Sequence, residues 1–449
     1  MEDSTLLIRP EDYSLLTDLY QLTMTACYVG EGIDQRTASF ELFVRRLPPD
    51  FGYLVAMGLT QALDYLQNLR FSPAQIQALQ ATGIFDHAPA AFWDLLQQAC
   101  FTGDVWAVPE GTVVFPNEPL LRIEAPLWQA QLVETYLLNT LNYQTLIATR
   151  AARLRDVAGE SAQLLEFGTR RAFSPQAALW AARAALAGGL DATSNVLAAL
   201  QLGQKPSGTM AHALVMAFSA LEGNEDEAFA AFHRYFPGAA LLIDTYDAIA
   251  AAQRLAIQCQ SGQLHLNAIR LDSGDLVSQS QKIKQLLPEV FIFASGDLDE
   301  AEILRLKAAG AQIDGYGLGT KLVTGTPVNG VYKLVDIDGI PVMKQSSGKS
   351  TYPGRKQIFR QLQNGQFHQD RLGLTTESPH PTEQPLLQLM MQQGHPTHSL
   401  ESLTTIAHRT RQAIATLPPA LRQIQSPTPA AIEYSAALVD LTEKTRLKT

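Results

Sequence analysis

The strongest constraint on the fold is an alternation of apolar runs and helical patterns in the middle of the chain. Helical periodicity separates five short apolar runs, of which the last three recur about every 22 residues. Parallel strands need a crossover between them, usually a helix, so this alternation predicts a parallel α/β sheet, either a tight barrel or a doubly wound sheet. The predicted strands are residues 163–167, 240–244, 267–271, 290–294 and 313–317. The predicted helices are residues 175–187, 247–258, 276–287 and 299–309.

Strand signals also occur on both sides of this region. Residues 38–44 and 111–115 are rich in β-branched and aromatic residues, and 330–335 and 340–344 flank an Asp-Gly turn that predicts a hairpin. Helical patterns are expected at 58–69, at 128–158 with a possible break at Asn139 and Asn142, and at 400–417, whereas 375–398 reads as loop and linker.

These patterns predict three segments. Residues 1–127 form the N-terminal part of a β-rich domain with helices, residues 128–325 form the α/β barrel with the substrate site, and residues 326–449 return to the β-rich domain and end in a helical tail.

Composition excludes several classes of function. The chain has 34 basic and 44 acidic residues, a net charge of −10, and no basic arm, so nucleic acid and anionic membranes are not expected partners. No run of about 18 apolar residues predicts a membrane span. Cys27, Cys100 and Cys259 lie far apart without a Cys-x-x-Cys pair. This argues against disulfides and a cysteine zinc site, and we expect a cytoplasmic protein.

Polar and glycine-rich segments follow the predicted strands, where parallel α/β proteins carry their functional groups. These segments are 168–171, 245–247, 272–275, 295–297 and 316–320. Glycines at 296 and 317–319 let backbone N–H groups approach a phosphate, although a glycine after a strand is often only a turn residue.

Charged side chains in these segments have the chemistry of a sugar-phosphate site. Arg170, Arg171 and Arg270 can each bind phosphate or carboxylate in a bidentate fashion. Asp272 or Asp275 can accept hydrogen bonds from ribose hydroxyls or hold a metal. The alternative for each arginine is a surface ion pair, so only their occurrence together indicates a site.

His212 follows a Gly-Thr turn at the expected start of a helix. Its plain interpretation is a core or capping histidine. Its functional interpretation is a nucleophile or general base whose second ring nitrogen is oriented by a carboxylate, for which Asp244 and Asp247 are the candidates.

Six motifs together resemble the nicotinate phosphoribosyltransferase family. They occur in the family's order, and the resemblance extends from residue 18 to about residue 360. The motifs are DLYQLTM at 18–24, FELFVRR at 40–46, EFGTRR at 166–171, GTMAH at 208–212, RLDSGD at 270–275 and GLGT at 317–320.

The resemblance implies an irregular, TIM-like α/β barrel of the type II phosphoribosyltransferases, joined to a β-rich domain built from both chain ends. It also implies a homodimer with active sites at the subunit interface. The implied reaction converts phosphoribosyl pyrophosphate and nicotinate into nicotinate mononucleotide and pyrophosphate, the first step of NAD salvage from nicotinate. ATP hydrolysis would be coupled to it through a phosphohistidine, with Mg²⁺ accompanying both phosphate substrates. His212 matches the modified histidine, and Asp244 resembles the carboxylate that orients it.

The resemblance further assigns substrate-binding roles. Tyr20, donated by the second subunit, and Phe167 would enclose the pyridine ring. Ser194 matches a position that holds a carboxylate in the nicotinamide-using relative, and Asp191, close by, is the alternative match. A carboxylate at this position would repel nicotinate, so Ser194 favours the acid as substrate. The remaining substrate-binding residues implied are Arg45, Arg46, Arg170, Thr209, Arg270, Asp272, Gly296, Gly319 and Thr320.

Two alternatives stay open. One is another barrel enzyme acting on sugar phosphates, including the quinolinate-using decarboxylating relative. The other is a non-catalytic barrel that binds a nucleotide and reports on NAD status. The sequence lacks a Walker-type GxxxxGK[ST] motif, so ATP is expected to bind in the same phosphate-rich pocket.

Overall fold

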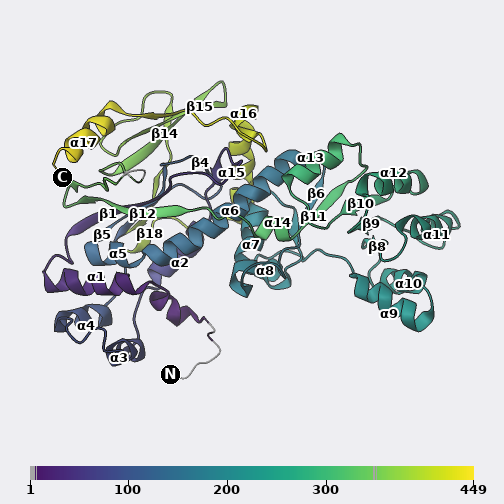
Figure 1. Ribbon diagram of the computed structural model, residues 1–449, viewed down its shortest axis with the longest axis horizontal. Helices are drawn as coiled ribbons and strands as arrows, with labels where there is room; N and C mark the ends of the chain where they lie inside the picture. Colours follow the sequence, from purple (N-terminus) through teal and green to yellow (C-terminus); the bar gives the residue numbers. More distant parts are fainter. Residues whose placement is uncertain (1–5, 7, 347–348, 350, 449) are drawn as a thin grey trace. The chain divides into compact units, whose positions relative to one another are not determined.

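The computed structural model describes residues 6, 8–346, 349 and 351–448, and their contacts divide the chain into two compact units (Figure 1). Unit 1 combines Met1–Leu146 with Pro327–Thr449, and unit 2 is Ile147–Thr326. The first division falls inside helix α6 (Glu134–Ala158), whereas the predicted boundary lies at 127/128. Unit 1 is therefore built from both ends of the chain.

Unit 2 is organised around a six-stranded parallel sheet. Its order, β7-β6-β11-β10-β9-β8, places the first strand of the unit beside the last, as in a barrel. No pairing joins β7 to β8 within the described residues, so the parallel α/β sheet is confirmed but a closed barrel is not. The strands are β6 (Gln163–Glu166), β7 (Ala192–Thr193), β8 (Leu241–Leu242), β9 (Ala268–Leu271), β10 (Phe291–Ala294) and β11 (Gly315–Leu318).

Helices connect these strands, and several begin at aspartates that the strand-end segments supply. Asp247 and Asp275 accept hydrogen bonds from backbone N–H groups in the first turns of α11 and α12, which are otherwise unpaired at a helix start. The helices are α7 (Pro175–Ala187), α8 (Val196–Gln201), α9 (His212–Glu222), α10 (Asp226–Tyr235), α11 (Ala248–Gln260), α12 (Leu276–Leu286), α13 (Glu300–Ala308) and α14 (Thr320–Val323).

Unit 1 contains a seven-stranded sheet with the order β13-β12-β1-β5-β3-β17-β18 and a two-stranded sheet, β2-β4. The predicted hairpin is present as β12 and β13. The prediction of a loop over 375–398 was wrong, because β17 pairs with β3 through long-range backbone contacts that the Gln- and Pro-rich sequence does not signal. The strands are β1 (Thr37–Val44), β2 (Leu54–Val55), β3 (Asp104–Ala107), β4 (Val113–Val114), β5 (Pro119–Pro126), β12 (Gly330–Ile337), β13 (Ile340–Pro341), β17 (Gln388–Gln392) and β18 (His395–Pro396).

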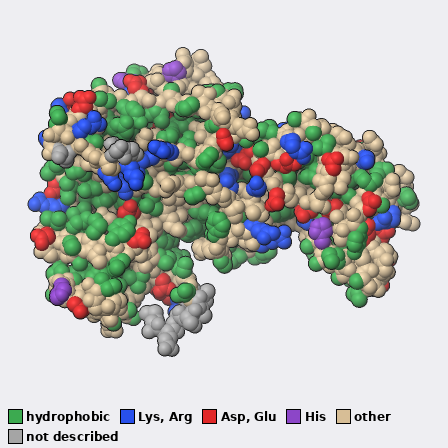
Figure 2. All heavy atoms as spheres, in the orientation of Figure 1, with side chains coloured by type: hydrophobic (Ala, Val, Ile, Leu, Met, Phe, Trp, Pro, Cys, Tyr) green, Lys and Arg blue, Asp and Glu red, His purple; other side chains and the backbone are tan. Residues whose placement is uncertain are grey.

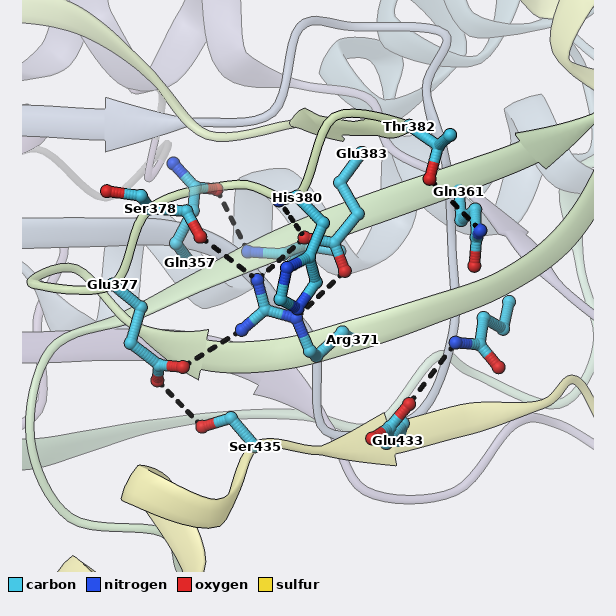
Figure 3. A network of polar contacts seen from close by, with 12 residues as sticks. Gln357, Gln361, Arg371, Glu377, Ser378, His380, Thr382, Glu383, Glu433 and Ser435 are labelled. Atoms are coloured by element: carbon cyan, nitrogen blue, oxygen red, sulfur yellow. Dashed lines mark hydrogen bonds and ion pairs between the residues drawn. The ribbon is translucent and has the colours of Figure 1, made fainter.

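A further sheet of unit 1 has the order β16-β14-β15-β19. It consists of β14 (Lys356–Gln363), β15 (Gln366–Leu374), β16 (Glu383–Pro385) and β19 (Ile432–Tyr434). Figure 3 shows Arg371 of β15 between Glu377 and Glu383. The Arg371 Nη1–Glu377 Oε2 distance is 2.9 Å and the Nη2–Glu383 Oε2 distance is 2.6 Å. Ser435 Oγ donates to Glu377 Oε1 at 2.7 Å, so one polar cluster joins β15, β16 and the segment after β19.

Helices complete unit 1. The expected break at Asn139 and Asn142 was wrong, because α6 runs through both residues and the interruption falls at Val133, between α5 and α6. The helices are a 3₁₀-helix (Pro10–Leu15), α1 (Leu19–Gly30), α2 (Leu59–Gln67), α3 (Pro73–Ala81), α4 (Ala90–Gln97), α5 (Leu127–Leu132), α15 (Leu403–Thr416), α16 (Pro419–Arg422) and α17 (Ala436–Arg446).

Among the described helices, none has the length and apolar character needed to cross a bilayer. On the face drawn in Figure 2, basic and acidic side chains lie interspersed among hydrophobic and uncharged surface.

Candidate active site

His212, the first residue of α9, lies beside residues from the ends of β8 and β9. Its Nδ1 is 3.0 Å from Thr245 Oγ1, and its Nε2 is 3.9 Å from Asp272 Oδ2. The imidazole is partly exposed, with 38% of its side-chain surface accessible. One ring nitrogen is therefore engaged by a hydroxyl, while the other faces a carboxylate at a distance that leaves it open to a reacting group.

Asp244 does not make the contact expected of it. Its Oδ2 accepts hydrogen bonds from the backbone N–H of Asp272 at 2.7 Å and from Ser273 Oγ at 2.8 Å. The predicted direct contact with His212 is thus replaced by Thr245 and Asp272. Asp244 Oδ1 is buried and has no hydrogen-bond partner in the described part of the chain. Asp244 shapes the loop that carries Asp272, and its second oxygen is available to a ligand.

Ser295, which the sequence analysis did not single out, fixes Asp272. Its hydroxyl donates to Asp272 Oδ1 at 2.5 Å, which joins the end of β10 to the loop after β9. Gly296 follows with φ of +94°, and a Cβ there would lie 2.3 Å from the carbonyl oxygen of Asp272. The predicted glycine is therefore required for the close approach of two strand-end loops.

Arg270 projects from β9 toward Thr209. Its Nη1 donates to Thr209 Oγ1 at 3.0 Å, while its buried Nε has no partner within the described residues. Burial lowers the pKa of the Arg270 guanidinium, the charges of Asp272 and Asp244 raise it, and the charge of Arg170 lowers it. Two predicted cations are thus close enough to interact, and such a pair favours an anion between them.

Phe167 follows β6 and lies against the backbone of β11. Its N–H donates to the carbonyl of Leu318 at 2.7 Å, and a Cβ at Gly317 would lie 2.6 Å from its ring carbons. The glycine leaves space for the aromatic ring at this end of the sheet. Gly319 and Thr320 come next, at the start of α14, where backbone N–H groups are free of helical partners.

Ser194 follows β7 at its carboxyl end. The alternative match, Asp191, precedes β7, and its carboxylate accepts from Arg155 Nη2 at 2.6 Å and from the Leu164 N–H at 2.7 Å. Gly208 lies near Ser194, since a Cβ on Gly208 would lie 3.9 Å from the Ser194 Cβ. Ser194, rather than Asp191, is therefore on the edge of the sheet that carries His212 and Arg270.

Three predicted residues belong to unit 1, and we describe them by themselves. Tyr20 is about half exposed on α1, and its hydroxyl donates to Glu134 Oε2 at 3.4 Å. Arg45 donates from Nη2 to the carbonyl of Lys349 at 3.4 Å, and Arg46 is exposed. Their roles toward a substrate stay predictions.

Comparison with known proteins identifies the family. The model of the nicotinate phosphoribosyltransferase (NAPRTase) family matches residues 162–371, the model of its N-terminal domain matches 15–142, and that of its C-terminal domain matches 368–442. The chain belongs to the nicotinate phosphoribosyltransferase family. The predicted resemblance is thereby confirmed.

Individual relatives cover most of the chain. Nicotinate phosphoribosyltransferase pncB2 of Mycobacterium tuberculosis is 40% identical over 93% of this chain and 90% of its own length. The nicotinate phosphoribosyltransferase of Bacillus subtilis is 42% identical over 88% of this chain and 81% of its own length. The nicotinate phosphoribosyltransferase of Homo sapiens is 34% identical over 92% of this chain and 93% of its own length.

Two solved structures share the fold. The crystal structure of human nicotinic acid phosphoribosyltransferase has a TM-score of 0.83 and 31% identity, covering 96% of this chain and 99% of that one. The structure of nicotinate-nucleotide pyrophosphorylase from Pyrococcus furiosus has a TM-score of 0.76 and 25% identity, covering 93% and 99%.

Proposed function

We propose that this protein transfers the phosphoribosyl group of phosphoribosyl pyrophosphate to nicotinate, coupled to ATP hydrolysis through phosphorylation of His212. The observation that carries the proposal is the position of His212 between Thr245 and Asp272, on the strand edge that also carries Arg270. Family membership supports the same reaction. The products would be nicotinate mononucleotide and pyrophosphate, the first step of NAD salvage from nicotinate in the cytoplasm.

In the transfer step, the bond between the anomeric carbon and a pyrophosphate oxygen breaks, and a bond from that carbon to the pyridine nitrogen forms. Positive charge develops on the sugar while negative charge develops on the leaving pyrophosphate, so positioning and charge stabilisation carry the catalysis. Arg170 would meet the departing anion or the nicotinate carboxylate. Asp272, held by Ser295, would accept from the ribose hydroxyls. Gly296, Gly319 and Thr320 would bind the 5′-phosphate through their backbone and the threonine hydroxyl.

Nicotinate binding needs a cation for the carboxylate and flat surfaces for the ring. The Arg270–Thr209 pair supplies the cation, and its unpartnered Nε leaves a donor for the ligand. Phe167 would stack on one face of the ring. In this proposal the protein is a homodimer, Tyr20 of a second copy covers the other face, and Arg45 and Arg46 contribute further cations.

In the ATP-dependent step, His212 Nε2 attacks the γ-phosphorus, the bond to the β,γ-bridging oxygen breaks, and ADP leaves. Thr245 Oγ1 holds Nδ1, which leaves Nε2 as the free nitrogen. Water later hydrolyses the phosphohistidine to histidine and phosphate. Binding free energy that differs between the two forms of the enzyme would couple hydrolysis to transfer.

Mg²⁺ fits the oxygen donors at this edge. The described residues include no group of three or more His, Cys, Asp or Glu side chains arranged for a metal, but Mg²⁺ commonly uses one or two carboxylates with phosphate and water oxygens. Asp272 and the unpartnered Oδ1 of Asp244 would hold it. When bound, the ion would neutralise charge on the pyrophosphate and on ATP.

The test compares substrates and labels the enzyme. Purified protein with phosphoribosyl pyrophosphate is given nicotinate, nicotinamide or quinolinate, with and without ATP, and mononucleotide and pyrophosphate are measured. Incubation with γ-labelled ATP should give an acid-labile, base-stable phosphohistidine that H212A lacks and that a control, H265A at an exposed histidine of the same unit, retains. Absence of nicotinate-dependent product refutes the substrate, and absence of label during turnover refutes the phosphohistidine.

A further inference from the structure

Glu166, the last residue of β6, is a buried carboxylic acid beside the proposed ring-binding residue Phe167. Only 1% of its surface is exposed. Burial raises the pKa of this carboxyl, and hydrogen bonds from Thr193 and from the N–H of Gly168 oppose the rise. Neither of these two partners carries a charge. Burying a carboxyl group among neutral partners costs folding free energy. The segments to which Glu166 is hydrogen-bonded therefore indicate its role.

Both carboxylate oxygens accept hydrogen bonds from neighbouring strand ends. Oε1 accepts from the N–H of Gly168, and Oε2 accepts from Thr193 Oγ1 at 2.5 Å. Thr193 Oγ1 in turn accepts from the N–H of Asn195 at 2.9 Å, so its own proton is directed to Glu166. A backbone hydrogen bond joins the same two strand ends, since the N–H of Ser194 donates to the Glu166 carbonyl at 2.9 Å. The donor pattern therefore matches an acceptor at both carboxylate oxygens.

The Gly168 side of this link is closely packed. A Cβ at Gly168 would lie 2.3 Å from Val323 Cγ1 and 2.9 Å from Glu166 Oε1. Only a glycine lets the backbone pass between the carboxylate and α14. The loop that carries Phe167 and Arg170 is thus held at a defined position relative to the sheet.

We infer that Glu166 is a positioning residue that holds the Phe167–Arg170 loop and the Ser194 loop at the separation the pyridine ring requires. The inference rests on the proposed function and deepens it, because it names the side chain that sets the geometry of the nicotinate subsite. Glu166 does not touch the ring; it acts through Gly168 and Thr193. A shift of the loops by a fraction of an ångström alters ring contacts much more than it alters phosphate contacts elsewhere on the edge.

The kinetic test uses E166Q in the full-length protein. Glutamine replaces one acceptor oxygen by an NH₂ donor, so one of the two donors loses its acceptor. Loss of a hydrogen bond to a charged group predicts a rise of about tenfold or more in KM for nicotinate. We expect a smaller rise in KM for phosphoribosyl pyrophosphate, because only Arg170 of the displaced loop is proposed to meet the pyrophosphate, whereas Gly296, Gly319 and Thr320, proposed for the 5′-phosphate, lie on other loops. T193V should reproduce the effect, and T193S, which keeps the hydroxyl, should not.

Two controls make the assignment specific. E289Q, at an exposed glutamate of the same unit, should leave both KM values unchanged. The double variant E166Q/T193V should be less impaired than the product of the two single effects, because both substitutions break one chain of hydrogen bonds. Multiplicative effects, or an equal rise in both KM values, would overturn the inference.

Amide hydrogen exchange tests, without relying on catalysis, whether Glu166 holds the two loops together. In E166Q, exchange should be faster than in the wild type in peptides covering 166–172 and 191–197 and unchanged in peptides of unit 1. Unchanged exchange in both segments would refute the inference that Glu166 holds the two loops. If the wild type makes no mononucleotide from nicotinate, the proposed function fails, and the exchange result alone decides whether Glu166 holds the two loops.

Discussion

Substitution of Glu118 tests whether a buried carboxyl of unit 1 is protonated in the folded protein. Glu118 and Asp370 are both fully buried, and Asp370 takes the Arg360 guanidinium in a bidentate pair, with Nε–Oδ1 at 2.9 Å and Nη2–Oδ2 at 2.5 Å. Glu118 Oε2 accepts from the N–H of Phe115 at 2.7 Å, while no donor among the described residues reaches Oε1. A side-chain hydrogen bond between Glu118 and Asp370 requires a proton on one of the two carboxyls, and it favours the protonated form of Glu118. Substitution E118Q keeps the shape of the side chain and makes it neutral.

The magnitude follows from proton linkage. Burial, followed by the charge of Asp370, raises the pKa of Glu118 well above its ordinary 4.5, so the folded protein holds a proton that the unfolded chain releases. This contribution to the free energy of unfolding is complete below pH 4.5 and declines as the pH rises toward the folded pKa. The decline is at most about 1.4 kcal/mol per pH unit. Because glutamine does not titrate, E118Q should gain stability on the wild type by at most about 1.4 kcal/mol for each pH unit between 4.5 and the folded pKa of Glu118.

The assay is the free energy of unfolding from denaturant titrations at fixed ionic strength between pH 5 and pH 8. E118Q should approach the wild type at the acid end and exceed it increasingly toward neutral pH. E443Q, at an exposed glutamate of α17, is the matched control and should follow the wild type. Parallel curves for E118Q and the wild type would show that Glu118 is ionised in the folded protein and would refute the reasoning.

Two further predictions concern unit 2. S194D should lower kcat/KM for nicotinate by about tenfold or more, because the new carboxylate faces the substrate's carboxylate, whereas S194A should change it only a few-fold; initial rates that are equal for S194D and S194A would contradict the pocket assignment. G296A should lower the free energy of unfolding by more than G262A does. Both glycines have positive φ, costing about 1–3 kcal/mol, but only at Gly296 does a Cβ meet the Asp272 carbonyl, and equal unfolding midpoints would contradict this.

The strands and helices of unit 2 were largely predictable because their signals are local. Helix α7 begins and ends at the predicted residues 175 and 187, since Ser174 caps it and alanines fill its buried face. The apolar runs of β6, β9, β10 and β11 were found for the same reason. By contrast, β7 has two residues and β17 lies in a Gln- and Pro-rich stretch, so each exists through pairing with a strand remote in sequence.

The sequence predicted most residues of the candidate site but few of the contacts between them. Arg270 and Asp272 were predicted at a strand end and His212 at the start of a helix, and the three lie on one edge of the sheet. The partner of His212 was not predictable, because Asp244 and Asp272 follow neighbouring strands and differ only in how their loops turn. Ser295 was predicted only as part of the polar segment 295–297, because a serine after a strand is common and does not by itself indicate a contact with Asp272.

The sequence by itself determined the alternation of strands and helices, the family, and the set of residues at the strand ends, because these depend on local composition and spacing. Only the tertiary structure decided that Asp247 and Asp275 cap helices while Asp244 and Asp272 shape the site. It also decided that Glu166 links two loops 27 residues apart. These outcomes depend on hydrogen bonds a few ångströms long between segments that the chain separates by tens of residues, and such distances exist only once the parallel strands have paired.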